Sequence, residues 1–277
     1  QIESRHLGLK MPEELPHIKE ELKLLSQAFA ETVSLDEIMT IAEEAGGLSQ
    51  PGIEEVKKGT ENKDMPVIAV ARDEAFCFYY EDNLQLLEEY GARLSYFSPL
   101  HDRTLPQECD GILLGGGYPE LYAEELGENK TMLSQIREAI SDGTPIVAEC
   151  GGFMYLHEFI QDKENKKQSM TGVIPAGCHD TGKLVRFGYI EIKEKKASFL
   201  PEGQVIRGHE FHYFDSTANG DDCVALKPVS GKKYDCVFDK NSCFVGFPHL
   251  YYPSAPQFAE NFVKKAKNYA DRSEVNS

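Results

Sequence analysis

The sequence predicts an α/β fold in which a mostly parallel sheet is covered by helices on both faces. Between residues 67 and 160, short apolar runs of strand length alternate with amphipathic segments of helical length. Strands buried on both faces are nearly continuous in hydrophobicity, and this alternation is typical of a three-layer sheet. The 277 residues suffice for one such domain and an extension.

The first 60 residues are expected to be mostly helical. In residues 13–33, the apolar side chains near helical spacing are Ile18, Leu22, Leu25 and Phe29. A second helix is expected at 34–46, with Ser34 or Asp36 as its N-cap and Gly46 as its end. Polar, glycine-rich residues 47–64 predict a linker. We therefore expect a helical extension with a linker at 1–64 and the α/β domain at 65–277.

The elements of the domain follow in strand–helix order. Strands are predicted at 67–71, 93–98, 110–117 and 145–150, and helices at 81–91, 132–143 and 152–160. Further strands are predicted at 185–193, 204–214, 223–229 and 243–250. An amphipathic helix at 255–272 completes the domain.

The composition excludes several classes of protein. A net charge of -17 argues against binding to a nucleic-acid backbone. No apolar run approaches the roughly 20 residues that span a bilayer. Seven cysteines without a Cys-x-x-Cys pair favour free thiols in a cytoplasmic protein and give no metal-ligand spacing. We therefore expect no nucleic-acid partner, no membrane partner and no metal. Because the chain begins at Gln1, we also expect it to be part of a longer protein.

Cys150 is the first candidate for chemistry. It follows the predicted strand 145–150 and precedes Gly151 and Gly152. It therefore falls on a strand-to-helix turn at the carboxyl edge of the sheet, where reactive groups gather. The N-terminus of the next helix is expected to lower the thiol pKa and favour the thiolate. The turn resembles the Gly-x-Ser-x-Gly elbow, with Ala148 replacing the first glycine. The alternative is a buried core cysteine.

Three consecutive glycines end the neighbouring predicted strand. Backbone N–H groups of Gly115, Gly116 and Gly117 could point into the crevice that holds Cys150. Acyl transfer needs such donors to hold an oxyanion. The alternative is a plain tight turn, which rarely needs three glycines in a row.

A thiolate nucleophile also needs a base. His249 is placed best, because it falls at the carboxyl end of the predicted strand 243–250. His209 and His212 compete with it from another predicted strand, on which residues 209 and 211 face one side and 210 and 212 the other. For each histidine the alternative is a structural role.

Two patterns are set aside. Residues 177–184 match Gly-x₄-Gly-Lys but end in Leu184, and a strand is predicted next, whereas a P-loop needs a helix whose N-terminus meets phosphate. The acidic run at 36–44 is interpreted as an exposed helix face.

Several stretches together resemble the glutaminase domain of the cobyrinic acid a,c-diamide synthases, which are class I (triad-type) glutamine amidotransferases. The resemblance covers about residues 65–270, and its motifs lie at 70–106, 113–120, 148–156, 186–189, 207–213 and 246–263. The segment RGHEFHY at 207–213 is the most specific, since the related cobyric acid synthases differ there. Residues 5–14 resemble the tail of the family's ATP-binding synthetase domain.

The resemblance implies a flavodoxin-like fold and a two-part reaction. Cys150 would attack the side-chain amide of glutamine, release ammonia and form a thioester that water hydrolyses. His249 would take the thiol proton, and Gly116 or Gly117 with the N–H of Gly151 would hold the oxyanion. The chain would be a C-terminal fragment without a cofactor of its own. In the full enzyme, ATP and Mg²⁺ would activate the a and c carboxylates of cobyrinic acid, the corrinoid acceptor.

One position departs from the class pattern. Most triad amidotransferases have a glutamate two residues after the histidine, where this chain has Tyr251. The resemblance therefore implies a Cys–His dyad, or a third acid from elsewhere such as Asp73 or Glu81. A surface for the corrinoid or the missing domain is expected at Arg207, His209, Glu210, His212 and Tyr213.

Other interpretations remain open at this point. The same domain could serve a nickel-sirohydrochlorin a,c-diamide synthase or a cobyric acid synthase. Two further alternatives are a non-catalytic docking module and a cysteine hydrolase of the related peptidase/chaperone type. The chain could also form a homodimer.

Overall fold

The computed structural model describes residues 4–5, 8–9, 15–47, 65–240 and 242–275. The chain divides into two compact units, residues 1–56 and 57–277. All but the first residue of the predicted linker at 47–64 lie outside the described residues. The two units are therefore described separately.

The described part of the first unit contains two helices and one pair of short strands. Strands β1 (Ser4–Arg5) and β2 (Gly8–Leu9) pair antiparallel, and helices α1 (Ile18–Thr32) and α2 (Leu35–Glu44) follow. Ser34 is the N-cap of α2, because its side chain accepts the N–H of Glu37. The two predicted helices are confirmed.

A six-stranded sheet lies at the centre of the second unit. Its order is β17-β18-β8-β6-β3-β5, and all pairs are parallel except β17–β18. The strands are β3 (Val67–Ala71), β5 (Arg93–Phe97), β6 (Gly111–Leu114), β8 (Ile146–Glu149), β17 (Phe238–Lys240) and β18 (Cys243–Gly246). The predicted mostly parallel sheet is confirmed.

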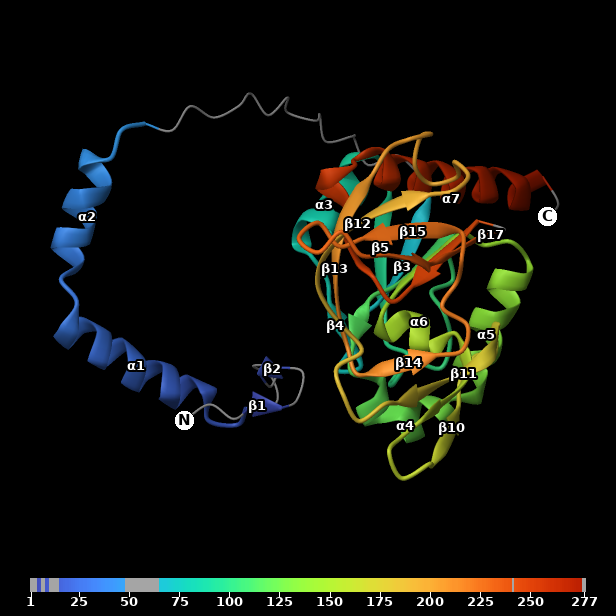
Figure 1. The fold of residues 1–277 in the computed structure, drawn as a ribbon, viewed down its shortest axis with the longest axis horizontal. Coiled ribbons are helices and arrows are strands. Elements are labelled where there is room, and N and C mark those ends of the chain that lie inside the picture. The colour runs from blue at the N-terminus through green and yellow to red at the C-terminus, as the bar shows by residue number, and fades with distance from the viewer. Residues whose placement is uncertain (1–3, 6–7, 10–14, 48–64, 241, 276–277) are drawn as a thin grey trace. The chain divides into compact units, whose positions relative to one another are not determined.

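Each face of this sheet packs against its own set of helices. One face meets α3 (Glu81–Glu89) and α7 (Gln257–Val275), and the other meets α4 (Ala123–Glu128), α5 (Lys130–Ser141) and α6 (Gly151–Tyr155). Within β3, Ile68 and Val70 belong to the first apolar cluster, and Ala69 and Ala71 to the second, as strand alternation requires. Figure 1 shows α3 beside α7, away from α4 and α5.

Two further sheets share these faces, and the sequence did not predict their extent. A five-stranded antiparallel sheet has the order β16-β15-β12-β13-β19 and contains β12 (Arg186–Glu194), β13 (Ile206–His212), β15 (Cys223–Leu226), β16 (Lys233–Cys236) and β19 (His249–Tyr251). A four-stranded sheet has the order β10-β9-β11-β14 and contains β9 (His157–Gln161), β10 (Lys167–Ser169), β11 (Ile174–Asp180) and β14 (Phe214–Ser216). Each face therefore carries a sheet as well as helices.

Three predicted elements are wrong in their extent. The strand predicted at 110–117 divides into β6 and β7 (Gly116–Gly117), which lie in different sheets. The helix predicted at 152–160 is only the five-residue α6, because the chain from His157 onward pairs with β10 and β11 as β9. The strand predicted at 243–250 divides into β18 and β19, which lie in different sheets. Pro248 has no N–H with which to continue a ladder, and it stands at this division.

The other described elements of the second unit are short. The remaining elements are β4 (Phe76–Phe78), β7 (Gly116–Gly117) and the 3₁₀ turns η2 (Pro119–Tyr122) and η3 (Tyr252–Ser254). Among the described helices, none is both long and apolar enough to cross a membrane.

Candidate active site

Cys150 occupies the turn between β8 and α6. Its backbone has φ 47° and ψ -100°, a conformation that side chains other than glycine's rarely adopt. The N–H of Cys150 donates to the carbonyl of Gly246 in β18 at 2.9 Å, and the N–H of Gly152 donates to the carbonyl of Gly115 at 2.9 Å. These bonds hold a strained turn between two neighbouring strands. The predicted strand-to-helix turn is confirmed.

The two glycines after Cys150 let α6 approach the turn that follows β6. A Cβ on Gly152 would lie 2.2 Å from the carbonyl oxygen of Leu114. A Cβ on Gly151 would lie 3.1 Å from the backbone nitrogen of Gly117. Only glycine permits this approach without movement of the backbone.

The glycine turn at 115–117 lies against both the segment that follows Cys150 and the ring of His249. A Cβ on Gly116 would lie 2.3 Å from Cε1 of His249, and one on Gly117 would lie 2.1 Å from the carbonyl oxygen of Ala75. The N–H of Gly115 donates to the hydroxyl of Tyr79 at 2.9 Å. The structure thus places Gly117 against Gly151, whose N–H hydrogen-bonds the sulfur of Cys150, and places Gly116 against His249.

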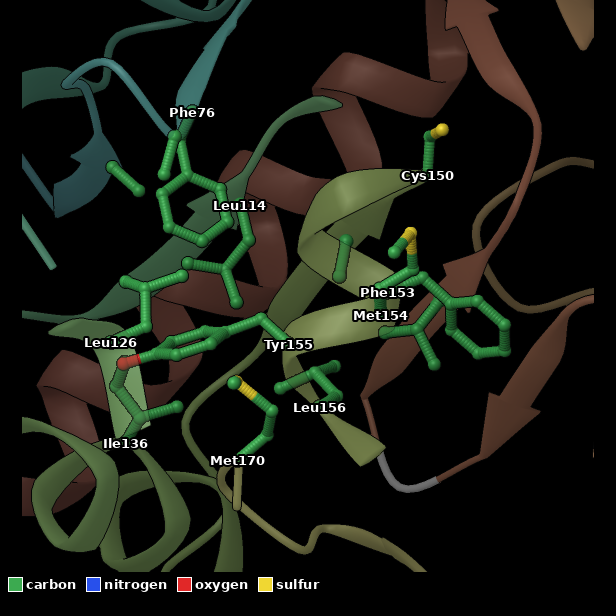
Figure 2. Packing of buried hydrophobic residues seen from close by; sticks show 14 of the residues in the cluster. Phe76, Leu114, Leu126, Ile136, Cys150, Phe153, Met154, Tyr155, Leu156 and Met170 are labelled. Atoms are coloured by element: carbon green, nitrogen blue, oxygen red, sulfur yellow. The ribbon is translucent and has the colours of Figure 1, made fainter. Parts of the chain in front are cut away.

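The thiol of Cys150 is neutral in this structure. Burial, with a further contribution from Glu120, raises its pKa well above the ordinary value, although the N–H of Gly151 hydrogen-bonds the sulfur and opposes the rise. The expected lowering of the thiol pKa is therefore wrong for this state, because α6 has only five residues and desolvation outweighs its N-terminal charge. Figure 2 shows Cys150 at the start of α6, its sulfur directed away from the packed Phe76, Leu114 and Tyr155.

His249 is also neutral. It begins β19 rather than ending β18, and it is 6% exposed. Burial and the nearby rings of His209 and His212 lower its pKa to about 3, against an opposing effect of Glu210. The ring of His209 stacks on it with centroids 4.7 Å apart and planes 11° apart. An uncharged imidazole has the protonation state that a general base requires.

The sequence did not single out Glu149, the residue before Cys150. Its side chain is buried and accepts the N–H of Leu250, and the hydroxyl of Tyr252 lies 3.4 Å from its Oε1. Burial raises the pKa of this carboxyl to about 8, against those two hydrogen bonds. Glu149 therefore joins the strand of the nucleophile to the strand of His249. A carboxyl in an otherwise apolar predicted strand was the signal available in the sequence.

Neither acid suggested as a third catalytic group contacts His249. Oδ1 of Asp73 accepts the N–H groups of Ala75 and Phe76, and its Oδ2 accepts the hydroxyl of Ser98 and the N–H of Leu100. Both carboxylate oxygens of Asp73 thus hold loop backbone. Glu81 is exposed in the first turn of α3.

The segment at 207–213 does not form one surface. Arg207 is exposed and His209 half-buried, whereas Glu210 and His212 are buried within this unit. The surface expectation is therefore wrong for Glu210 and His212, because β13 turns alternate residues inward. Tyr213 follows β13 and is half-buried.

Glu210 lies in a buried cluster of polar groups. It contacts the hydroxyl of Tyr234, and Arg186 Nη1 lies 3.3 Å, His212 Nε2 3.8 Å and Lys227 Nζ 3.9 Å from its carboxylate. Desolvation raises its pKa, but the nearby His212, a hydrogen bond from Tyr234 and the charge of Arg186 lower it further, so that the pKa is below the ordinary value.

The residues present do not fit a nucleotide or metal site. The segment 177–184 leaves β11 and leads into β12, so no helix N-terminus follows it. Within the described ranges, no three His, Cys, Asp or Glu side chains are grouped as metal ligands. Glutamine hydrolysis in this unit is therefore derived without ATP or Mg²⁺.

Known proteins of similar fold and sequence show the class to which this chain belongs. The fold is that of the class I glutamine amidotransferases, as the resemblance predicted. The structure of PurLQS from Thermotoga maritima aligns with a TM-score of 0.51 at 17% identity, over 74% of this chain and 99% of that one, which supports the fold alone. Residues 67–254 match the CobB/CobQ-like glutamine amidotransferase domain, and the chain belongs to this family.

Two relatives are named cobyrinate a,c-diamide synthase. The one from Fusobacterium nucleatum is 39% identical over 94% of this chain, and the one from Dehalococcoides mccartyi is 36% identical over 97%. The chain spans 59% of the length of each relative. The resemblance stated from the sequence is confirmed.

Proposed function

We propose that this chain is the glutamine-hydrolysing part of an ATP-dependent amidotransferase that amidates the a and c carboxylates of cobyrinic acid in cobalamin biosynthesis. The observation that carries the proposal is the position of Cys150 on a strained turn, beside a glycine turn that places Gly117 against Gly151 and Gly116 against His249. The names of the relatives support the corrinoid acceptor.

The reaction starts with both groups neutral. As the sulfur of Cys150 attacks the side-chain amide carbon of glutamine, its proton passes to His249. The carbonyl π electrons move to oxygen, and the N–H groups of Gly151 and Gly117 stabilise the oxyanion. When the oxyanion collapses, the C–N bond breaks, His249 returns the proton to nitrogen, and ammonia leaves a thioester. Water, deprotonated by His249, then attacks the thioester carbon, the C–S bond breaks, His249 returns the proton to the sulfur of Cys150, and glutamate leaves.

The protonation states decide when the proton moves. Burial keeps the proton on the sulfur in the free protein, because it disfavours both the thiolate and the imidazolium. We therefore propose general-base catalysis in which proton transfer accompanies attack, rather than a resting thiolate–imidazolium pair. Bound glutamine and the oxyanion donors stabilise the charge that develops during the attack.

The rest of the enzyme is also part of the proposal. Residues 1–64 would be the remnant of the synthetase domain and a linker, and ATP, Mg²⁺ and the corrinoid would bind in the part of the relatives that this chain does not span. Free thiols at all seven cysteines support a reducing compartment such as the cytoplasm. A dyad of Cys150 and His249 is the catalytic set we propose.

The test measures glutamate release and labelling by a glutamine-analogue chloroketone, on this chain and on a polypeptide that includes a synthetase part. Cys150→Ala should abolish both signals, and His249→Ala should lower turnover by about 10²–10⁴-fold. Cys109→Ala is the matched control, because Cys109 is a half-buried free thiol outside the site. Turnover that persists in Cys150→Ala would refute the proposal, and a cobyrinic acid amidation assay on the longer polypeptide tests the acceptor.

A further inference from the structure

Among the residues that the structure describes, no carboxylate forms a hydrogen bond or an ion pair with the ring of His249. Its Cε1 edge lies against Gly116, and one face of its ring is covered by His209. The two histidines are directly opposite each other in the pairing of β13 with β19. The nearly parallel ring of His209, with its centroid 4.7 Å away, limits the tilt of the His249 imidazole. A carboxylate that accepts the imidazole N–H would limit the tilt in the same way, by hydrogen bonding.

His209 is itself oriented by a second layer of aromatic side chains. The hydroxyl of Tyr80 lies 3.2 Å from Nδ1 of His209, and the two rings meet edge to face. Tyr80 packs edge to face on Tyr251, whose hydroxyl donates to Asp82 at 3.1 Å. Tyr251 occupies the position where most triad amidotransferases have their glutamate. An aromatic series therefore runs from that position back to His249.

The charge state of His209 fits this role. Burial lowers its pKa, with Glu210 opposing, so the ring is neutral near neutral pH. A neutral ring accepts an imidazolium beside it, whereas a protonated His209 would repel one. The titratable groups that face or neighbour His209 are His249 on β19, Tyr80 before α3, Tyr189 opposite it on β12, and Glu210 on β13.

We propose that His209 is a positioning residue for the catalytic base: its ring, oriented by Tyr80, holds His249 against Gly116 in place of the missing acid. This inference rests on the proposed function, because it needs His249 to act as the base. It also separates His209 from the surface role expected from the sequence.

The experiment compares His209→Ala, His209→Phe and Tyr80→Phe in the polypeptide that shows glutamine turnover. His209→Ala should lower kcat by about 10–100-fold with KM changed less than about threefold, since a small displacement of a catalytic group costs this much. His209→Phe keeps a flat ring and should retain activity within about fivefold of wild type, with its acidic limb moved to lower pH because position 209 can no longer become charged. Tyr80→Phe should fall between them. Lys193→Ala, exposed on the same sheet, is the control.

A second measurement does not depend on activity. The ring of His209 shifts the proton resonances of His249 by its ring current, so His209→Ala should remove that shift and His209→Phe should keep one. Equal losses in the Ala and Phe variants, or an unaffected Ala variant, would overturn the inference. If the Cys150→Ala variant still hydrolyses glutamine, the proposed function fails instead of the role of His209. The two failures are therefore distinguishable.

Discussion

Cys150 and His249 lie in one site but are held in different ways. Cys150 is fixed by backbone, through its positive φ, the N–H groups around it and the glycines that follow. His249 is fixed by side chains and close approach, since His209 covers its ring and Glu149 binds the N–H of the next residue. The difference teaches that the proposed nucleophile depends on local chain geometry, whereas the proposed base depends on packing between distant segments.

The largest effect on this comparison is expected at Gly152, where the backbone that holds Cys150 would be disturbed. Gly152→Ala should lower the free energy of unfolding by about 3 kcal/mol, because its Cβ would meet the carbonyl oxygen of Leu114 at 2.2 Å and backbone cannot move aside cheaply. Urea unfolding measures the loss. Gly111→Ala is the matched control in β6, where the new Cβ meets the Cβ of Ala266 at 3.3 Å and should cost less than about 1 kcal/mol. Similar losses in both variants would contradict the explanation.

Gly116 tests the other half of the comparison. In Gly116→Ala the obstacle is the ring of His249, a side chain that can be displaced, with its Cε1 2.3 Å from the new Cβ. Turnover should fall by about 10²-fold while the free energy of unfolding changes by less than about 1 kcal/mol. Glutaminase assays and urea unfolding of the same preparations check this. A loss of stability equal to that of Gly152→Ala would show that Gly116 belongs to the backbone half.

Glu149 should link stability to pH. Burial raises its pKa from an ordinary 4.5 to about 8, so the folded state keeps a proton that the unfolded state releases. The stabilisation is therefore complete below pH 4.5 and is lost as the pH rises to about 8, with a slope on the order of 1 kcal/mol per pH unit. Glu149→Gln cannot ionise and should lack this loss, as unfolding at pH 5 and pH 8 would show. Parallel pH dependences in the two proteins would rule out a buried protonated carboxyl.

The smallest effect is expected at Tyr252. Its hydroxyl lies 3.4 Å from Oε1 of Glu149, a long hydrogen bond in a buried setting. Tyr252→Phe should cost about 0.5–1 kcal/mol in the free energy of unfolding and leave turnover nearly unchanged. A loss of turnover larger than that of Gly116→Ala would mean that Tyr252 acts on the reaction directly.

The sequence predicted best what is local. The strand at 67–71 matches β3 in full, and Cys150 lies on the predicted turn, because apolar runs and glycines act through their immediate neighbours. The helix predicted at 152–160 failed because β10 and β11 draw His157 onward into a sheet. The roles of Glu149 and His209 depend on β19, which is far away in the chain, and no local pattern predicts such contacts.

The backbone at position 150 also bears on how this chain can change. With φ 47° and ψ -100°, glycine is the residue that this turn accommodates without strain, and any L side chain there costs about 1–3 kcal/mol. Cys150→Gly should therefore be more stable than Cys150→Ala. Mutants chosen for heat resistance alone would drift toward glycine at this position and away from a thiol. At this one residue, the proposed catalytic role of the thiol therefore opposes the stability of the fold.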